Sequence, residues 1–260
     1  QKVLRMTGED PPPYATLAVI GLARIYYNWN DLERAEKYAE QSHQLARLCE
    51  QVIDRLISSE LFLSRLKITR RDPVSADHFL TLAEQHARQY EYTVRFPDIA
   101  ADRAILCLYQ GDTDAAAQLV QHEDRWLVRA EVLIAQGNPS AALAIIVPHR
   151  HKMKEKRLDD QLLVTIVLQA LALYAQGENE SARQDLKESL TLAEPGGFIR
   201  LFVDAGEPMR LMLQDLITWM VQHPDEQGQS LMAYVEKILA AFASPPEAQS
   251  SKLINQQSDL

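Results

Sequence analysis

Apolar residues recur at helical spacing along most of this chain, and short polar turns interrupt them. Five segments share one pattern, in which an apolar helix is followed by a polar turn and a second helix. They are residues 23–39, 64–80, 104–120, 130–146 and 170–186. No stretch alternates strictly between apolar and polar positions, so we expect essentially no β-sheet. The repetition predicts an all-α fold of stacked helix hairpins.

Small residues occupy two fixed places in each segment. The first position is Ala or Ser, and an Ala follows twelve residues later. These pairs are Ala23 and Ala35, Ser64 and Ala76, Ala104 and Ala116, Ala130 and Ala142, and Ala170 and Ala182. The second alanines are 41, 40, 26 and 40 residues apart, so the third repeat is cut short and the others exceed the roughly 34 residues of a tetratricopeptide unit. Small residues at both places allow two antiparallel helices to pack closely, which predicts an α-solenoid of tetratricopeptide-like hairpins forming a right-handed superhelix.

The turns between the paired helices carry residues that start and stop helices. Asn30 followed by Glu33 predicts a capping box, and Asp72 and Asn138 each precede a proline in a position to cap the next helix. Glycines stand where the first helix must end in a left-handed residue, at Gly111, Gly137 and Gly177.

The repeat pattern stops near residue 195, where the sequence AEPGGFIRLFVDAGEPMRLML is broken twice by glycine and proline. We expect a short helix within FIRLFVDA, a helix from Met209 to about Gln222, and a last helix from Ser230 to Phe242. The predicted organisation is a tail of a preceding repeat or linker at 1–13, repeats at 14–194, closing helices at 195–243, and a flexible linker at 244–260. Because the chain has no initial Met, we expect it to be a piece of a longer protein.

Composition narrows the classes of function. The 260 residues are 47% hydrophobic with a formal net charge of −9, and a surface this acidic disfavours direct binding of nucleic acid by this fragment. The two cysteines, Cys49 and Cys107, lack metal-binding spacing and are expected to be reduced in a cytoplasmic protein. No apolar run reaches the roughly 18 residues of a membrane span, and no signal-peptide pattern is present.

The sequence offers little catalytic chemistry. Histidines do not share metal-ligand spacing, and paired carboxylates such as Asp159 and Asp160 occur at helix starts, where they favour the helix dipole. No nucleophile motif is present, so we expect neither an enzyme nor a cofactor or metal. The basic run PHRHKMKEKR at 148–157 is interpreted as a solvated loop and helix start, with an anion- or partner-binding patch as the alternative.

A ligand of such a solenoid would lie on the concave surface formed by the first helices. Aromatic rings with a few hydrogen-bonding groups suit a polar small molecule. Positions expected to face inward are Arg24, Tyr27, Asn28, Arg65, Tyr109, Glu131 and Tyr174. These are the candidate ligand-binding residues, with sealing of helix against helix as the alternative role of the tyrosines. Trp29 and Trp126 are interpreted as packing residues at hairpin ends, and Trp219 as part of the closing helices.

Three stretches resemble the sensor region of MalT-like transcriptional regulators, the large ATP-dependent members of the LuxR class. They are YNWNDLERAE, RAEVLIAQGNPSAAL and LALYAQGENESARQDLKESLTLAEPGGFIRLFVDAGEPM, within a match of about 13–220. The resemblance implies that the segment after the last repeat closes the superhelix and precedes a linker and a DNA-binding helix-turn-helix. The nucleotide-binding motif GxxxxGK[ST] and the helix-turn-helix of that family are absent from this chain, so the resemblance assigns ATP hydrolysis and DNA binding to other domains of the regulator.

Two functions remain open at this point. The first is a sensor or signalling domain of a bacterial transcription regulator, which binds a small-molecule effector or a regulatory protein on its concave face. The second is a general protein-interaction scaffold with a peptide-binding groove. An enclosed aromatic pocket with convergent polar groups favours a small molecule, whereas a long open channel favours a peptide.

Overall fold

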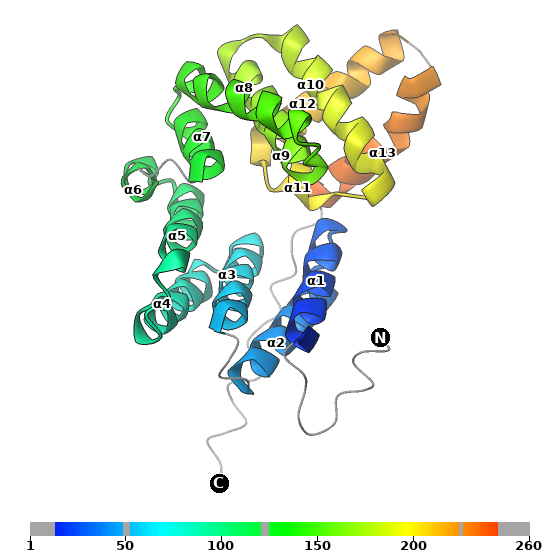
Figure 1. Ribbon diagram of the computed structural model, residues 1–260. Helices are drawn as coiled ribbons and strands as arrows, with labels where there is room; N and C mark the ends of the chain where they lie inside the picture. The colour runs from blue at the N-terminus through cyan, green and yellow to red at the C-terminus, as the bar shows by residue number, and fades with distance from the viewer. Residues whose placement is uncertain (1–13, 49–52, 121–124, 224–225, 244–260) are drawn as a thin grey trace.

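The computed structural model describes residues 14–48, 53–120, 125–223 and 226–243, and all regular secondary structure within these ranges is helical (Figure 1). The α-helices are α1 (Tyr14–Asn28), α2 (Leu32–Leu48), α3 (Ile53–Thr69), α4 (Pro73–Gln89), α5 (Phe96–Gln110), α6 (Thr113–Leu119), α7 (Trp126–Ala135), α8 (Pro139–Glu155), α9 (Asp159–Gln176), α10 (Asn179–Ala193), α11 (Arg200–Val203), α12 (Gly206–Gln222) and α13 (Glu226–Ala243). Two short 3₁₀ helices, Thr93–Arg95 and Glu194–Gly196, lie before α5 and after α10.

Consecutive helices pack as five hairpins, α1–α2, α3–α4, α5–α6, α7–α8 and α9–α10, which correspond to the five sequence repeats. Every repeated small residue is at most 1% exposed, from Ala23 and Ala35 in the first hairpin to Ala170 and Ala182 in the last. Without bulky side chains at these points, the paired helices approach closely. The predicted solenoid of helix hairpins is confirmed, and the shortened third repeat is explained by α6, which ends at Leu119.

The hairpin turns follow one backbone rule. The residue seven places after the first small residue has a positive φ in all five repeats, with values of 63° at Asn30, 60° at Arg71, 83° at Gly111, 73° at Gly137 and 87° at Gly177. The predicted capping by Asp72 and Asn138 is confirmed, because their side chains accept hydrogen bonds from the amides of Ser75 and Ala141 at 3.0 and 3.3 Å.

The capping box predicted at Asn30 is wrong. Since Asn30 takes the left-handed conformation that ends α1, the cap moves one residue on to Asp31, whose carboxylate accepts a hydrogen bond from the amide of Arg34 at 3.1 Å. Asn tolerates this left-handed backbone better than most residues do.

Three helix boundaries differ from expectation. Helix α12 begins at Gly206 rather than Met209, since Pro208 fits in a first turn whose amides need no helical partner. Helix α13 begins at Glu226 rather than Ser230. The basic run at 148–157 is mostly the C-terminal half of α8 and not a loop, and its cations complement the negative end of that helix.

Some expectations cannot be compared with the structure. The tail at 1–13, the linker at 244–260 and Cys49 lie outside the described residues. Cys107 is a half-buried free thiol on α5. Among the described helices, none combines the length and the apolar character that crossing a membrane would require.

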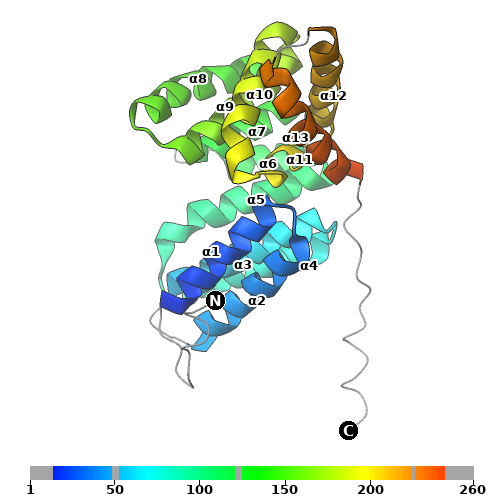
Figure 2. The ribbon, with the colours of Figure 1, turned by 90° about the vertical axis from the view of Figure 1, so that its right-hand side faces the viewer.

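The hairpins curve into a ring. The first helices contact one another in order from α1 through α3, α5 and α7 to α9, and α11 then contacts α1 (Figures 1 and 2). Helices α12 and α13 pack against α9 and α10, so the closing helices extend a large hydrophobic cluster from Ala130 to Ile238. The two ends of the repeat array are thereby brought together.

The contact between the two ends, here called the ring seam, joins residues 27–30 to residues 196–204. The amide of Ile199 donates a hydrogen bond to the carbonyl of Asn28 at 2.7 Å, and the indole of Trp29 donates to the carbonyl of Gly196 at 2.8 Å. Gly197 has a φ of 65°, and a Cβ at this residue would lie 3.5 Å from the Trp29 ring. The glycine and proline residues that interrupt the sequence therefore let the backbone reach the first hairpin.

Candidate functional site: a cavity inside the ring

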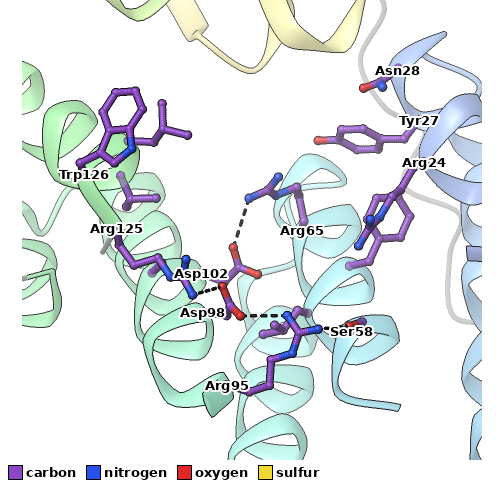
Figure 3. A pocket seen from close by; sticks show the side chains of 15 residues that line it. Arg24, Tyr27, Asn28, Ser58, Arg65, Arg95, Asp98, Asp102, Arg125 and Trp126 are labelled. Atoms are coloured by element: carbon purple, nitrogen blue, oxygen red, sulfur yellow. Dashed lines mark hydrogen bonds and ion pairs between the residues drawn. The ribbon is translucent and has the colours of Figure 1, made fainter. Parts of the chain in front are cut away.

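A cavity of about 450 Å³ lies on the inner side of the ring, between α1, α3, α5 and α7 (Figure 3). All four helices are the first helices of their hairpins, which the solenoid pattern predicted as the concave surface. The lining residues are Arg24, Tyr27, Asn28, Ser58, Leu61, Phe62, Arg65, Arg95, Asp98, Ala101, Asp102, Arg125, Trp126, Leu127 and Val128. Most of them carry hydrogen-bonding side chains, so the lining is more polar than that of a typical small-molecule site.

Four of the seven candidate residues line this cavity. Arg24, Tyr27 and Asn28 come from α1, and Arg65 comes from α3. Arg65 extends toward the middle of the cavity, between Tyr27 on one wall and Trp126 on the other (Figure 3). Its side chain keeps 47% of its surface exposed, because the cavity is open to solvent.

The other three candidates lie elsewhere. Tyr109 stands in the last turn of α5 and is 44% exposed, and Tyr174 lines a separate hollow of about 280 Å³ between α9, α10 and α12. Glu131 is half-buried on α7, next to the cavity-lining turn and close enough for Arg65 to act on its charge. The ligand-binding role of all seven residues stays a prediction.

The superhelical twist explains this division. In α1 the lining residues follow Ala23 by one to five positions, whereas most of those in α3, α5 and α7 precede the corresponding Ser64, Ala104 and Ala130. The cavity thus crosses the helices diagonally. Choosing one fixed position in every repeat therefore finds the wall at α1 and misses it at later helices.

The sequence reasoning missed several lining residues, including Arg95, Asp98 and Asp102. Arg95 ends the 3₁₀ helix just before α5, and the two aspartates follow on α5. Their spacing of three and four residues is the signal that could have found them. Trp126 was interpreted as a packing residue. It does stack on His149, with ring centroids 4.1 Å apart, but it also lines the cavity.

Ion pairs fix most charged side chains of the cavity. Arg95 Nε lies 2.8 Å from Asp54, and its Nη1 lies 2.9 Å from Asp98. Arg125 Nη2 contacts Asp98 at 2.7 Å. These bonds tie α3, α5 and the start of α7 together, so they hold the wall of the cavity in place.

A second pair spans the centre of the cavity wall. Arg65 Nη2 lies 3.1 Å from the Asp102 carboxylate, which raises the pKa of Arg65 above its usual range and keeps the guanidinium charged. On the neighbouring α7, burial raises the pKa of Glu131 to about 7, while the charge of Arg65 opposes the shift. Glu131 therefore changes its protonation state near neutral pH.

Tyr27 belongs both to the cavity and to the ring seam. Its hydroxyl donates a hydrogen bond to Asp204 at 2.6 Å and lies 2.9 Å from the Thr69 hydroxyl. Burial, followed by the negative charge of Asp204, raises the pKa of Tyr27 above its usual range. The guanidinium of Arg200 lies 5.6 Å from the Tyr27 ring centroid and forms an ion pair with Asp204. The cavity wall and the seam therefore share the Tyr27 side chain.

The separate hollow at Tyr174 is built around Trp219. Lys187 Nζ and Arg183 Cζ lie 4.9 and 5.5 Å from its ring centroid, and His223 stacks on it at 4.7 Å. These cations cover the indole face.

Elsewhere, fully buried Glu60 on α3 lies 3.2 Å from His43 Nε2 and 2.9 Å from His86 Nδ1, which ties α2, α3 and α4 together. Within the described part of the chain, no group of three His, Cys, Asp or Glu residues has the arrangement of a metal site.

The fold defines a tetratricopeptide-like helical solenoid with a cavity on its concave side. The sequence model of the MalT-like TPR region matches residues 1–218, and the chain belongs to this family. It is similar to the HTH-type transcriptional regulator MalT of Yersinia enterocolitica, Yersinia pestis and Yersinia pseudotuberculosis, with 26% identity over 210 residues in each case. Each match covers 75% of this chain and 23% of the relative, so the chain spans less than a quarter of the length of these regulators.

Proposed function

We propose that this chain is the sensor region of a cytoplasmic transcription regulator of the LuxR class, and that a small-molecule effector binds in the cavity inside the ring. Membership of the MalT-like family and the likeness to transcriptional regulators support the class of protein. In this proposal, other domains of the regulator hydrolyse ATP and bind DNA. The cavity binds a ligand and does not catalyse a reaction.

One observation carries the proposal. Tyr27 and Asn28 line the cavity, and the same two residues bond to the closing segment through Asp204 and the amide of Ile199. An effector that contacts this wall can favour one arrangement of the seam over another, and a ligand shifts an equilibrium by the difference in its affinity for the two states. The proposed signal thus passes from the cavity to the closing helices.

The size of the cavity supports an effector over a peptide partner. A volume of about 450 Å³ lies within the range of roughly 300–1,000 Å³ typical of small-molecule sites. A protein-interaction scaffold remains the competing function, and the experiment below separates the two.

The test is a thermal-shift screen of the chain against sugars, nucleotides and aromatic metabolites. A ligand that binds only the folded state raises the unfolding midpoint, corresponding to about 2.7 kcal/mol at a hundredfold excess over its dissociation constant. Trp126 lines the cavity and Trp219 lines the other hollow, so they locate any hit. We expect the ligand to change tryptophan fluorescence in the wild type and in Trp219→Phe, and to change it much less in Trp126→Phe.

Two outcomes would contradict the effector proposal. A fluorescence change lost only in Trp219→Phe would place the ligand in the wrong hollow. No saturable hit across the library, together with capture of a protein partner that Arg65→Glu abolishes, would favour the scaffold instead.

A further inference from the structure

Arg24 differs from the other arginines of the cavity. Arg65, Arg95 and Arg125 each form an ion pair with a neighbouring aspartate. Among the described residues, Arg24 has no hydrogen-bond or ion-pair partner, and no dashed line reaches it in Figure 3. A guanidinium offers five donors that match the oxygens of a carboxylate or phosphate. This side chain therefore has hydrogen-bond donors that no described residue uses.

Arg24 is solvent-exposed, and the nearest charges that act on it are mostly those of other arginines. Desolvation against the cavity wall, followed by the like charges of Arg65, Arg95 and Arg55, lowers the pKa of Arg24, while the charge of Asp102 opposes this shift. Perturbed charges in a cavity are typical of functional sites.

The cavity aspartates do not compete for this role. Asp102 is engaged by Arg65, and Asp98 is held by both Arg95 and Arg125. The carboxylates are thus already paired with arginines of their own. Among the described residues, the charge left unpaired on the wall near α1 is that of Arg24. A positively charged or neutral ligand would leave that charge unmatched.

Aromatic and apolar side chains line the same cavity as Arg24. Tyr27 and Phe62 meet edge to face with ring centroids 5.6 Å apart, Leu61 lies one residue before Phe62, and Trp126 stands on the opposite wall. We infer, resting on the effector function proposed above, that the cavity binds a small organic anion whose carboxylate or phosphate contacts Arg24 and whose apolar body packs against Phe62 and Trp126.

The test uses a matched pair of probes, 3-phenylpropionate and its uncharged amide, together with inorganic phosphate as an anion without an apolar body. Binding to the chain is measured by calorimetry at low ionic strength in a phosphate-free buffer. The variants are Arg24→Gln and, as a control for the same loss of charge, Arg47→Gln on the exposed end of α2. Comparison of acid with amide requires no variant and stands even if a substitution disturbs folding.

We expect 3-phenylpropionate to bind the wild type and Arg47→Gln alike, at least about tenfold tighter than the amide or phosphate. Arg24→Gln should weaken binding of the acid at least about tenfold and leave the amide unaffected. The variant should unfold at a midpoint no lower than that of the wild type, because it removes a repelled charge.

Equal binding of acid and amide, undiminished binding of the acid to Arg24→Gln, or no binding of either anion would each overturn the inference. These failures are distinct from failure of the effector function. A neutral hit in the thermal-shift screen that loses its signal in Trp126→Phe would preserve an effector site while excluding an anionic effector, whereas the absence of any cavity ligand would remove both.

Discussion

Individual residues of the cavity divide into those that hold the ring together and those left open to a ligand. Tyr27 illustrates the first role, because its buried hydroxyl serves Asp204 and Thr69. Arg24 illustrates the second, since it faces the same cavity without a partner among the described residues. Both are polar side chains of one helix, three positions apart. Tyr27 is buried and bonded, whereas Arg24 is exposed and has no partner among the described residues.

Glu131 gives a residue-scale prediction of pH dependence. Its folded-state pKa of about 7 lies above the ordinary value of 4.5, so the folded protein holds a proton that the unfolded chain has released between these pH values. The free energy of unfolding therefore falls as pH rises through this window. Glu131→Gln should remove that loss and be more stable than the wild type at pH 8, by an amount on the order of 1–3 kcal/mol that shrinks toward pH 5.

Urea unfolding at pH 5, 6, 7 and 8 measures this effect. Glu236→Gln, on the exposed face of α13, removes the same charge and controls for the net charge of the chain. A difference between Glu131→Gln and the wild type that stays constant from pH 5 to pH 8 would show that Glu131 does not titrate in this range.

At the scale of helices and hairpins, local chemistry accounts for most of the structure. The small residues twelve positions apart predicted all five hairpins, and Asp72 and Asn138 predicted two helix starts, because each is a contact within one repeat. The prediction that Asn30 caps the second helix was wrong, because Asn30 adopts the left-handed conformation that ends the first helix. Arg71 shows that the same turn also forms without glycine or asparagine.

The turn geometry predicts opposite effects for one substitution at two glycines. Gly177 has a φ of 87° and Gly21 lies within α1, and a Cβ at either would meet no atom within 4 Å. Gly177→Ala should lower the free energy of unfolding by about 1 kcal/mol, because an L-residue is strained in the left-handed region. Gly21→Ala should raise it by about 0.5–1 kcal/mol through helix propensity.

Urea denaturation of both variants beside the wild type provides the measurement. Because both sites are open, packing differences do not enter the comparison. If Gly177→Ala raised the free energy of unfolding, as expected for Gly21→Ala, the left-handed assignment of the turn at Gly177 would be contradicted.

At the scale of the whole molecule, sequence patterns were a weaker guide. The resemblance to MalT-like regulators implied that the segment after the last repeat closes the superhelix. It did not reveal the contact with α1, which joins residues more than 160 positions apart, as in the bond from Trp29 to Gly196. The diagonal path of the cavity likewise depends on the accumulated twist of successive hairpins. For that reason the sequence-predicted residues that line the cavity are those of the first two hairpins, Arg24, Tyr27, Asn28 and Arg65. The later candidates Tyr109 and Tyr174 do not line it.

The central claim is that the ring seam connects the cavity wall to the closing helices through Tyr27, and amide hydrogen exchange tests it most directly. Tyr27→Phe removes only the hydroxyl that joins Asp204 and Thr69, while Tyr38→Phe makes the same change on α2, where the ring stacks on Tyr26. We predict that Tyr27→Phe raises exchange together in peptides covering 14–28 and 197–204, including the amide of Ile199, and leaves α9 and α10 protected. Tyr38→Phe should leave the exchange at the seam unchanged. Seam peptides that exchange alike in all three proteins would contradict the account.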